Sequence, residues 1–350
     1  MAAATLSLVD TILFADTVEW CKDPRYRGIL ACGTYQLDEK SGQRLGGIEL
    51  YKLQEDMQGL EKTGSVSVAG VLDMRWSPVV GNTTQSLLLI ANADQHVRMY
   101  SLDTTSTGHQ TKLEATGSVK IPSDRDPATN SILCLSIDVQ RSLVVISDSA
   151  GCITLIDSES MDVNRQWKGH AYEAWVATFD NWNSDIILSG GDDSKLCIWD
   201  RRESEPIYTK RFEMGVCSIQ SHPKKENQYI TGSYDEVARL WDQRKPSTPL
   251  KELHLGGGVW RLKWHPCLPN VLGSATMYAG FHVLNIETQR IIYQYNGGRD
   301  DERKEKEVLL GYGIDWFPCS ESESETRKST MLASCSFYDH SLQLWTCEII

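Results

Sequence analysis

The chain has 350 residues, a formal net charge of −12 and eleven tryptophans. Its 41% hydrophobic and 23% charged residues are typical of a folded protein, so the composition excludes wholesale disorder. The acidic balance argues against a protein that binds nucleic acid, because binding to phosphates depends on Lys and Arg.

The N-terminal segment and the cysteines predict where the protein works. Residues 1–20 have no basic region and carry Asp10 and Asp16, so they do not resemble a signal peptide. No apolar run reaches the roughly 18–20 residues of a membrane span. The ten cysteines form no Cys-x-x-Cys pair and no zinc-binding spacing, so we expect reduced, mostly buried thiols. These features predict a cytoplasmic protein without a metal or a cofactor.

Short alternating strands repeat along the whole chain. Segments 189–200 (SGGDDSKLCIWD) and 231–242 (TGSYDEVARLWD) align without gaps and end just after Trp199 and Trp241. Five further segments share this shape and end at Tyr51, Tyr100, Ile156, Leu284 and Trp345. The apolar runs are short and are bounded by Gly, Asp, Asn, Ser or Pro, a pattern typical of strands joined by tight turns.

Seven such units predict the fold. Each unit of about 43 residues or more holds four antiparallel strands, which is typical of a propeller blade. The last unit ends after its third strand, whereas residues 5–14 precede the first unit. We predict that these residues supply the missing strand and close the ring, because closure removes a free sheet edge. The sequence therefore predicts an all-β, single-domain, seven-bladed β-propeller over residues 1–350, with polar insertions near 101–130, 299–307 and 320–329.

A second repeated motif places most of the remaining tryptophans. It precedes the first one in several units and ends in an aromatic residue, as in Trp20, Trp76, Trp264 and Trp316. Trp175 and Trp260 differ, because each lies four residues before this aromatic position, where the innermost strand of its unit begins. The equivalent positions in the other units are Asp16, Leu72, Leu133, Cys217 and Tyr312.

The repeats resemble the WD-repeat family across essentially the whole chain. The resemblance implies that a turn aspartate ties each of several blades together, at Asp94, Asp193, Asp235 and Asp339. It also implies a structural hydrogen-bonded chain through His170, Ser189, Asp193 and Trp199.

In that family the start of the innermost strand lies at the mouth of the central channel, on the face that usually binds partners. Trp175, Trp260, Tyr312 and Asp16 are therefore our candidate substrate-binding residues. Either they only anchor the strand ends, or their aromatic faces bind a cation.

No catalytic motif is present, since GxSxG, Walker A, GxGxxG and HExxH are all absent. A histidine beside an aspartate in a turn at the channel mouth could act as a general base. His340 with Asp339 is our first catalytic candidate and His96 with Asp94 the second. The alternative is that these are solvated histidines in turns.

Four strings carry a closer resemblance, at residues 256–266, 278–285, 311–316 and 335–345. They resemble the diphthine methylesterase family of the diphthamide pathway. The resemblance implies an ester hydrolase that removes the methyl ester from methylated diphthine on translation elongation factor 2. It implies this factor as the partner. From the acidic charge and the short apolar runs we expect no nucleic-acid or membrane partner, and we expect a monomer. Two other interpretations remain, a non-enzymatic WD-repeat scaffold and a reader of methylated lysine.

Overall fold

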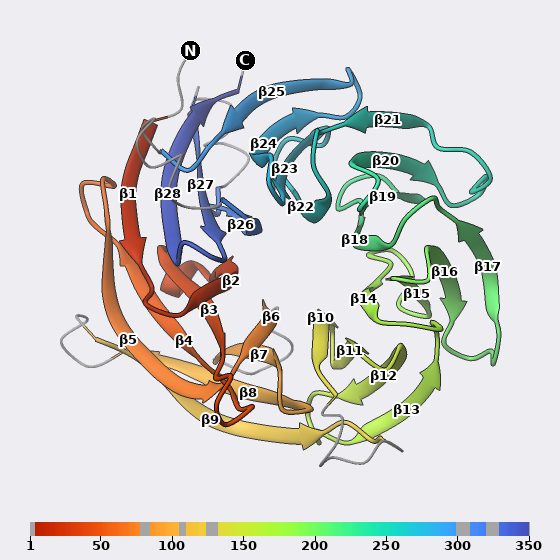
Figure 1. Cartoon of the computed structure of the whole chain (residues 1–350), viewed down its shortest axis with the longest axis horizontal. Helices are drawn as coiled ribbons and strands as arrows, with labels where there is room; N and C mark the ends of the chain where they lie inside the picture. The colour runs from red at the N-terminus through yellow and green to blue at the C-terminus, as the bar shows by residue number, and fades with distance from the viewer. Residues whose placement is uncertain are drawn as a thin grey trace.

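A computed structural model describes residues 4–77, 85–104, 110–123, 132–298, 309–319 and 329–349. The strands in these residues form seven four-stranded antiparallel sheets, which surround a central axis as the blades of a propeller (Figure 1). This confirms the predicted all-β, seven-bladed fold. No helix in the described part of the chain is long and apolar enough to cross a membrane.

Six blades run from an innermost to an outermost strand in chain order. Blade 1 contains β2 (Phe14–Trp20), β3 (Ile29–Leu37), β4 (Arg44–Leu53) and β5 (Leu60–Ala69), with the short 3-10 helix η1 (Pro24–Tyr26) after β2. Blade 2 contains β6 (Val71–Trp76), β7 (Ser86–Asn92), β8 (His96–Thr104) and β9 (Thr111–Lys120). Blade 3 contains β10 (Cys134–Gln140), β11 (Leu143–Asp148), β12 (Cys152–Asp157) and β13 (Val163–Lys168). Blade 4 contains β14 (Ala174–Phe179), β15 (Ile186–Gly191), β16 (Lys195–Asp200) and β17 (Pro206–Arg211). Blade 5 contains β18 (Val216–Ser221), β19 (Gln228–Ser233), β20 (Val237–Asp242) and β21 (Lys251–His254). Blade 6 contains β22 (Val259–Trp264), β23 (Val271–Thr276), β24 (Gly280–Asn285) and β25 (Arg290–Tyr295).

Blade 7 joins the two ends of the described chain and closes the ring. It contains β26 (Gly311–Trp316), β27 (Ser329–Ser336) and β28 (Ser341–Glu348), with β1 (Ala4–Asp10) antiparallel beside β28 as its outermost strand. The closing strand ends at Asp10 instead of residue 14, because a turn follows in which the Thr11 N–H donates to the His340 carbonyl.

The expected polar insertions fall mostly outside the described residues. Residues 299–308 and 320–328 lie outside them, as do 105–109 and 124–131. Within the predicted insertion at 101–130, however, β9 forms the fourth strand of blade 2. Its alternating Thr111–Lys120 sequence is the outermost strand that the repeat requires, so that part of the segment is a strand and not an insertion.

The repeated tryptophans hold the blades together in two ways. Trp199, Trp241 and Trp345 donate their indole N–H groups within their own blades, to hydroxyls 2.8, 2.9 and 3.1 Å away. Trp76 and Trp316 donate across the blade boundary, to the backbone carbonyls of Glu19 and Lys263 at 3.1 and 2.9 Å. Repetition of these two positions explains most of the tryptophan content.

The predicted hydrogen-bonded chain of blade 4 is present. His170 Nδ1 lies 2.9 Å from Asp193 Oδ1, His170 Nε2 lies 2.7 Å from Ser189 Oγ, and Trp199 Nε1 donates to the same hydroxyl. Burial alone would raise the pKa of Asp193, but hydrogen bonds from His170 and from the Ala171 N–H lower it to about 2. The pair is a structural element of this blade, as predicted.

Replacing Asp193 with Asn is expected to lower the free energy of unfolding by about 1.5–3 kcal/mol, because the variant loses charge-assisted hydrogen bonds. The folded-state pKa of about 2 is below the ordinary 3.8, so this stabilisation is present above pH 3.8 and disappears as the pH falls through about 2. Urea denaturation of the wild type and Asp193→Asn should therefore converge at acidic pH. The exposed Asp162 provides the control, and Asp162→Asn should change stability by less than about 0.5 kcal/mol. A gap that stays constant with pH would contradict this explanation.

Candidate functional site

A β-bulge lies near the start of every innermost strand. In each one the pairing with the second strand of the blade shifts by one residue. The residues at the seven shifts are Asp16, Leu72, Leu135, Trp175, Cys217, Trp260 and Tyr312. In blade 3 the shift falls at Leu135 and not at the predicted Leu133, because the innermost strand begins only at Cys134. A bulged residue is released from the alternation of the strand, so its side chain can point in a new direction.

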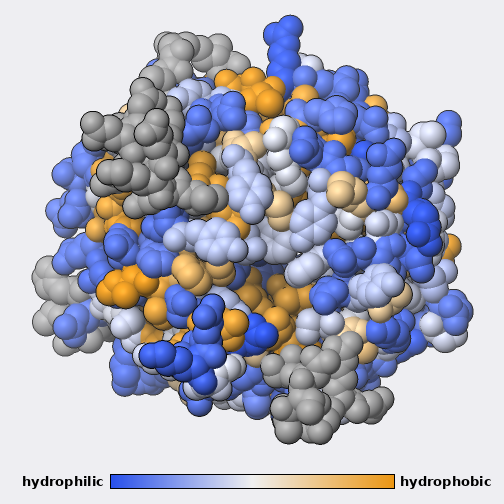
Figure 2. Space-filling model, in the orientation of Figure 1, coloured by the Kyte–Doolittle hydropathy of each residue, from blue (hydrophilic) through white to orange (hydrophobic). Residues whose placement is uncertain are grey.

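These bulged residues line one pocket at the mouth of the central channel. The pocket has a volume of about 230 Å³. All four candidate binding residues, Trp175, Trp260, Tyr312 and Asp16, line it together. In Figure 2, which shows this face of the propeller, hydrophobic and weakly polar side chains surround a hollow at the centre. The structure thus brings together residues that are up to almost 300 positions apart in the sequence.

The aromatic side chains form a continuous row along one side of the pocket. The rings of Trp260 and Tyr312 are 4.9 Å apart, and Tyr312 lies 4.9 Å from Phe337. Trp175 meets Trp260 edge-on at 5.4 Å, and its indole N–H donates to Asp192 Oδ1 at 3.1 Å. Aliphatic residues of blades 2 and 3, Leu72, Leu133 and Leu135, line the pocket as well.

Sequence reasoning missed part of this row. Tyr35, Tyr234 and Phe337 also line the pocket. Tyr35 lies near the end of β3, and Tyr234 and Phe337 directly follow the second strand of their blades. A signal was available, because Tyr234 and Phe337 lie one and two residues before the turn aspartate in the segments TGSYD and CSFYD. Arg261 was missed too, although it directly follows the bulged Trp260.

A buried carboxylate gives the pocket its charge. Asp16 is only 4% exposed. Its burial raises its pKa well above the ordinary value, Arg261 opposes this rise, and the charge of Asp73 adds to it. Arg261 is itself shared, since its guanidinium lies 3.2 Å from Asp73 Oδ1. The pocket therefore combines aromatic surfaces with a carboxylate whose negative charge is poorly compensated.

A layer of ion pairs lies deeper in the channel. Asp73 is fully buried between Arg261 and Arg75, at 3.2 and 3.1 Å, and accepts a hydrogen bond from the Ile137 N–H of the next blade. Burial alone would raise the pKa of Asp73, but the two arginines outweigh this effect and lower it.

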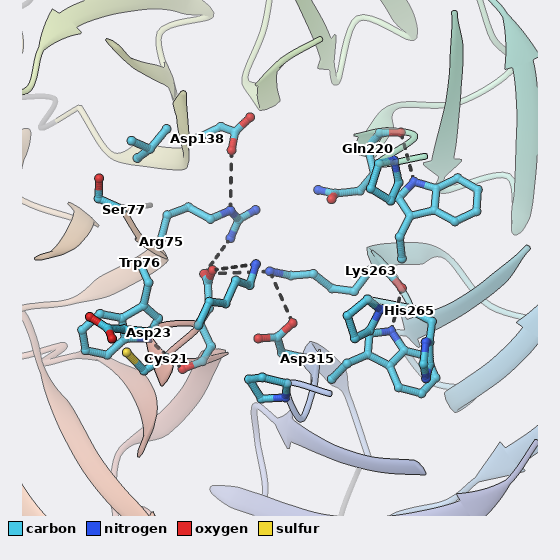
Figure 3. Close-up of a pocket in the computed structure, with 18 of the residues that line it drawn as sticks. Cys21, Asp23, Arg75, Trp76, Ser77, Asp138, Gln220, Lys263, His265 and Asp315 are labelled. Carbon is cyan, nitrogen blue, oxygen red and sulfur yellow. Dashed lines mark hydrogen bonds and ion pairs between the residues drawn. The ribbon is translucent and has the colours of Figure 1, made fainter. Parts of the chain in front are cut away.

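A second pocket of about 680 Å³ opens on the other side of this layer. In Figure 3, Arg75 points toward Asp138, and Lys263 points toward Asp315. Lys263 Nζ lies 3.8 Å from carboxylate oxygens of both Glu19 and Asp315. Burial lowers the pKa of Lys263, and the charge of Arg75 lowers it further.

The two predicted general bases lie outside the aromatic pocket. His340 Nδ1 is 4.0 Å from Asp10 Oδ1, its ring lies 5.0 Å from Phe14, and Asp339 accepts a hydrogen bond from Ser341. Asp94 binds Arg98 at 2.8 and 2.5 Å, and His96 Nδ1 lies 2.9 Å from the Asp94 carbonyl. None of these four residues is among those that line the pocket in the described part of the chain.

Comparison with known proteins first defines the class. The model of the WD domain, G-beta repeat, matches residues 162–200. A solved structure of the mitotic checkpoint complex contains a chain that superimposes with a TM-score of 0.68 over 98% of this chain and 91% of that one, at 14% sequence identity. The protein is therefore a propeller of the WD-repeat class with an aromatic, acidic pocket at its channel mouth.

Sequence relatives then define the family. The chain is 35% identical to diphthine methyltransferase of Homo sapiens, over 90% of this chain and 75% of that protein. It is 32% identical to the diphthine methyltransferase homolog of Dictyostelium discoideum, over 95% and 96%, and 31% identical to diphthine methyltransferase of Schizosaccharomyces pombe, over 94% and 96%. The chain belongs to the diphthine methyltransferase family.

This finding corrects the predicted activity. The sequence strings had implied a hydrolase that removes a methyl ester, but the relatives are named for the transfer of a methyl group. The prediction of a diphthine methyl ester hydrolase is thus contradicted, whereas the prediction of a protein that handles diphthine agrees with the names. The general-base role predicted for His340 and Asp339 belongs to that hydrolysis.

Replacing Asp73 with Asn should be strongly destabilising, because it leaves Arg75 and Arg261 without the buried carboxylate between them. Loss of one partner of a buried ion pair costs about 3–5 kcal/mol. Asp94→Asn, which breaks the more exposed pair with Arg98, is the matched control and should cost less than about 1 kcal/mol. Chemical denaturation of both variants tests this, and equal losses would show that the ion layer does not organise the channel.

Proposed function

We propose that this protein takes part in a methyl-transfer step on diphthine and that the pocket at the channel mouth binds the trimethylammonium group of that side chain. The observation that carries the proposal is the convergence of Trp175, Trp260 and Tyr312 around a cavity that also contains the buried Asp16. The names of the relatives supply the substrate class.

The chemistry of the group fits these residues. A quaternary ammonium has no N–H to donate, so hydrogen-bond acceptors cannot hold it by hydrogen bonding. It is attracted instead by the faces of aromatic rings, most strongly by Trp, and by negative charge nearby. The pocket offers both, and its aliphatic side at Leu72 and Leu133 can contact the methyl groups.

The surroundings of the pocket suit a side chain carried by a protein, which we propose is translation elongation factor 2. Five large apolar residues are exposed in the loops of this face. They are Ile12, Tyr172, Met214, Tyr278 and Tyr338. They belong to blades 4 to 7 and to the crossing into blade 1, the blades that also carry the aromatic row. Exposed apolar residues grouped in this way are typical of surfaces that contact other proteins.

The methyl-transfer step is tested with elongation factor 2 from cells that lack this protein, incubated with the purified chain and a methylsulfonium donor whose methyl group carries an isotopic label. The proposal expects label in the factor, at the diphthine side chain, and none in the donor-only reaction. If the factor stays unlabelled although the chain still binds it, methyl transfer is contradicted and the protein only recognises the factor.

Trp260→Ala should weaken binding of tetramethylammonium, used as a minimal probe, by about tenfold, because it removes the aromatic face between Trp175 and Tyr312. Isothermal titration calorimetry measures the affinity. Trp182→Ala is the matched control, since Trp182 is half exposed in the loop between β14 and β15, away from the pocket. Equal affinities for wild type and Trp260→Ala would refute the aromatic site.

Binding of the same probe should strengthen as the pH rises above the ordinary carboxyl range. Burial raises the pKa of Asp16, so at low pH the carboxyl is protonated and neutral, and it gains its charge only as the pH passes this raised value. The affinity should change by at most about tenfold per pH unit, because one proton is linked to binding. Asp16→Asn should bind weakly at every pH, and a variant that keeps the pH dependence would assign it to another group.

A further inference from the structure

Two thiols from neighbouring blades meet at the opposite end of the channel. Cys267 lies in the turn after β22 of blade 6, and Cys319 follows β26 of blade 7. Their Sγ atoms are 3.0 Å apart, and the Cys267 thiol lies 3.3 Å from the backbone carbonyl of Cys319, to which it donates. A disulfide bond is about 2.0 Å long, so the sulfurs would need to approach by only about 1 Å.

Contacts that do not involve sulfur fix the position of Cys267. Its N–H donates to His265 Nδ1 at 3.1 Å, and its carbonyl accepts a hydrogen bond from Lys224 Nζ at 3.0 Å. His265, labelled in Figure 3, reaches across to Thr330 Oγ1 of blade 7 at 3.3 Å. The two sulfurs are therefore brought together by the packing of the blades, so that little chain entropy is lost when they join.

The two thiols differ in how easily a reagent can reach them. Cys267 is 8% exposed, whereas Cys319 is half-buried and lines the 680 Å³ pocket. A small disulfide entering this pocket meets Cys319 first. This arrangement, an accessible attacking thiol beside a buried second thiol, is what stepwise thiol–disulfide exchange requires.

We propose that Cys267 and Cys319 form a reversible disulfide that joins blade 6 to blade 7, by exchange with a small disulfide of the glutathione class. The Cys319 thiolate attacks one sulfur of glutathione disulfide, the S–S bond breaks, and one glutathione thiolate leaves. The Cys267 thiolate then attacks the Cys319 sulfur and releases the second glutathione. The two protein thiols are oxidised, one glutathione disulfide is reduced to two thiols, and the two protons pass from the cysteines to the leaving thiolates.

The bond would act on the stability of the whole ring. It closes a loop between positions 52 residues apart and so restricts the unfolded chain. It also adds a covalent connection at a boundary that is otherwise held by contacts such as the hydrogen bond from Trp316 to the Lys263 carbonyl. The proposal is independent of the function assigned to the channel mouth.

The test treats the full chain with glutathione disulfide and maps its peptides without reduction. We expect one crosslinked peptide pair containing Cys267 and Cys319, a protein lighter by two hydrogen atoms, and a Tm several degrees above that of the reduced chain. Dithiothreitol should reverse all three. A chain that keeps ten free thiols after treatment, or a crosslink between other cysteines, would overturn the proposal.

Two variants test which of the two thiols attacks glutathione disulfide first. Cys267→Ser should stop at the mixed disulfide and retain one glutathione on Cys319, whereas Cys319→Ser should take up none at Cys267. Cys152→Ser is the matched control, because Cys152 is also half-buried but lies in blade 3, and it should crosslink like the wild type. Melting of the reduced variants confirms that they are folded. A glutathione adduct on Cys267 in Cys319→Ser would refute the assigned order.

Discussion

The β-bulge at the start of each innermost strand is the constraint on which the binding site depends. Regular strands would send alternate side chains into the two faces of a blade, where the neighbouring blades cover them. One extra residue in each of seven strands releases one side chain per blade from that alternation, and the ring directs all seven toward one point. The backbone and the tryptophans hold the blades, whereas the bulged residues determine the chemistry. This propeller places Trp175, Trp260 and Tyr312 there, with Asp16 as the acidic member.

Charge compensation along the channel explains why Asp16 differs from the other buried carboxylates. Asp73 has two arginines within 3.2 Å and a backbone donor from the next blade, and its pKa is lowered. Burial and the charge of Asp73 raise the pKa of Asp16, and Arg261, which opposes this rise, is already paired with Asp73. The ion layer therefore stabilises the fold by keeping its own charges paired and leaves the negative charge at the channel mouth poorly compensated. A bound cation would supply the missing charge, and it would do so where water is partly excluded and electrostatic attraction is stronger.

The sequence predicts the fold well because the signals of a blade are local. Alternating strands and tight turns recur in every unit, and the closing strand follows from counting the strands of the last unit. Trp175 and Trp260 were found by the same counting, four residues before a repeated aromatic. Arg261, Tyr35 and Phe337 were missed, because their meeting depends on side chains converging from different blades. The activity was predicted wrongly for another reason. It rested on a family resemblance without any catalytic set of residues, and the strings that identify the family do not distinguish ester hydrolysis from methyl transfer.

The boundary between blades 6 and 7 connects the two ends of the channel. At one end Trp260 of blade 6 and Tyr312 of blade 7 lie 4.9 Å apart in the aromatic row. At the other end Cys267 and Cys319 of the same two blades are 3.0 Å apart, with His265 bonded across the boundary between them. The innermost strands of these two blades, β22 and β26, are each only six residues long, so a rotation of one blade against the other would displace both pairs together. The packing that holds the aromatic rings at contact distance is therefore the same packing that brings the thiols together. In this fold, the geometry of the pocket cannot be separated from the fit between these two blades.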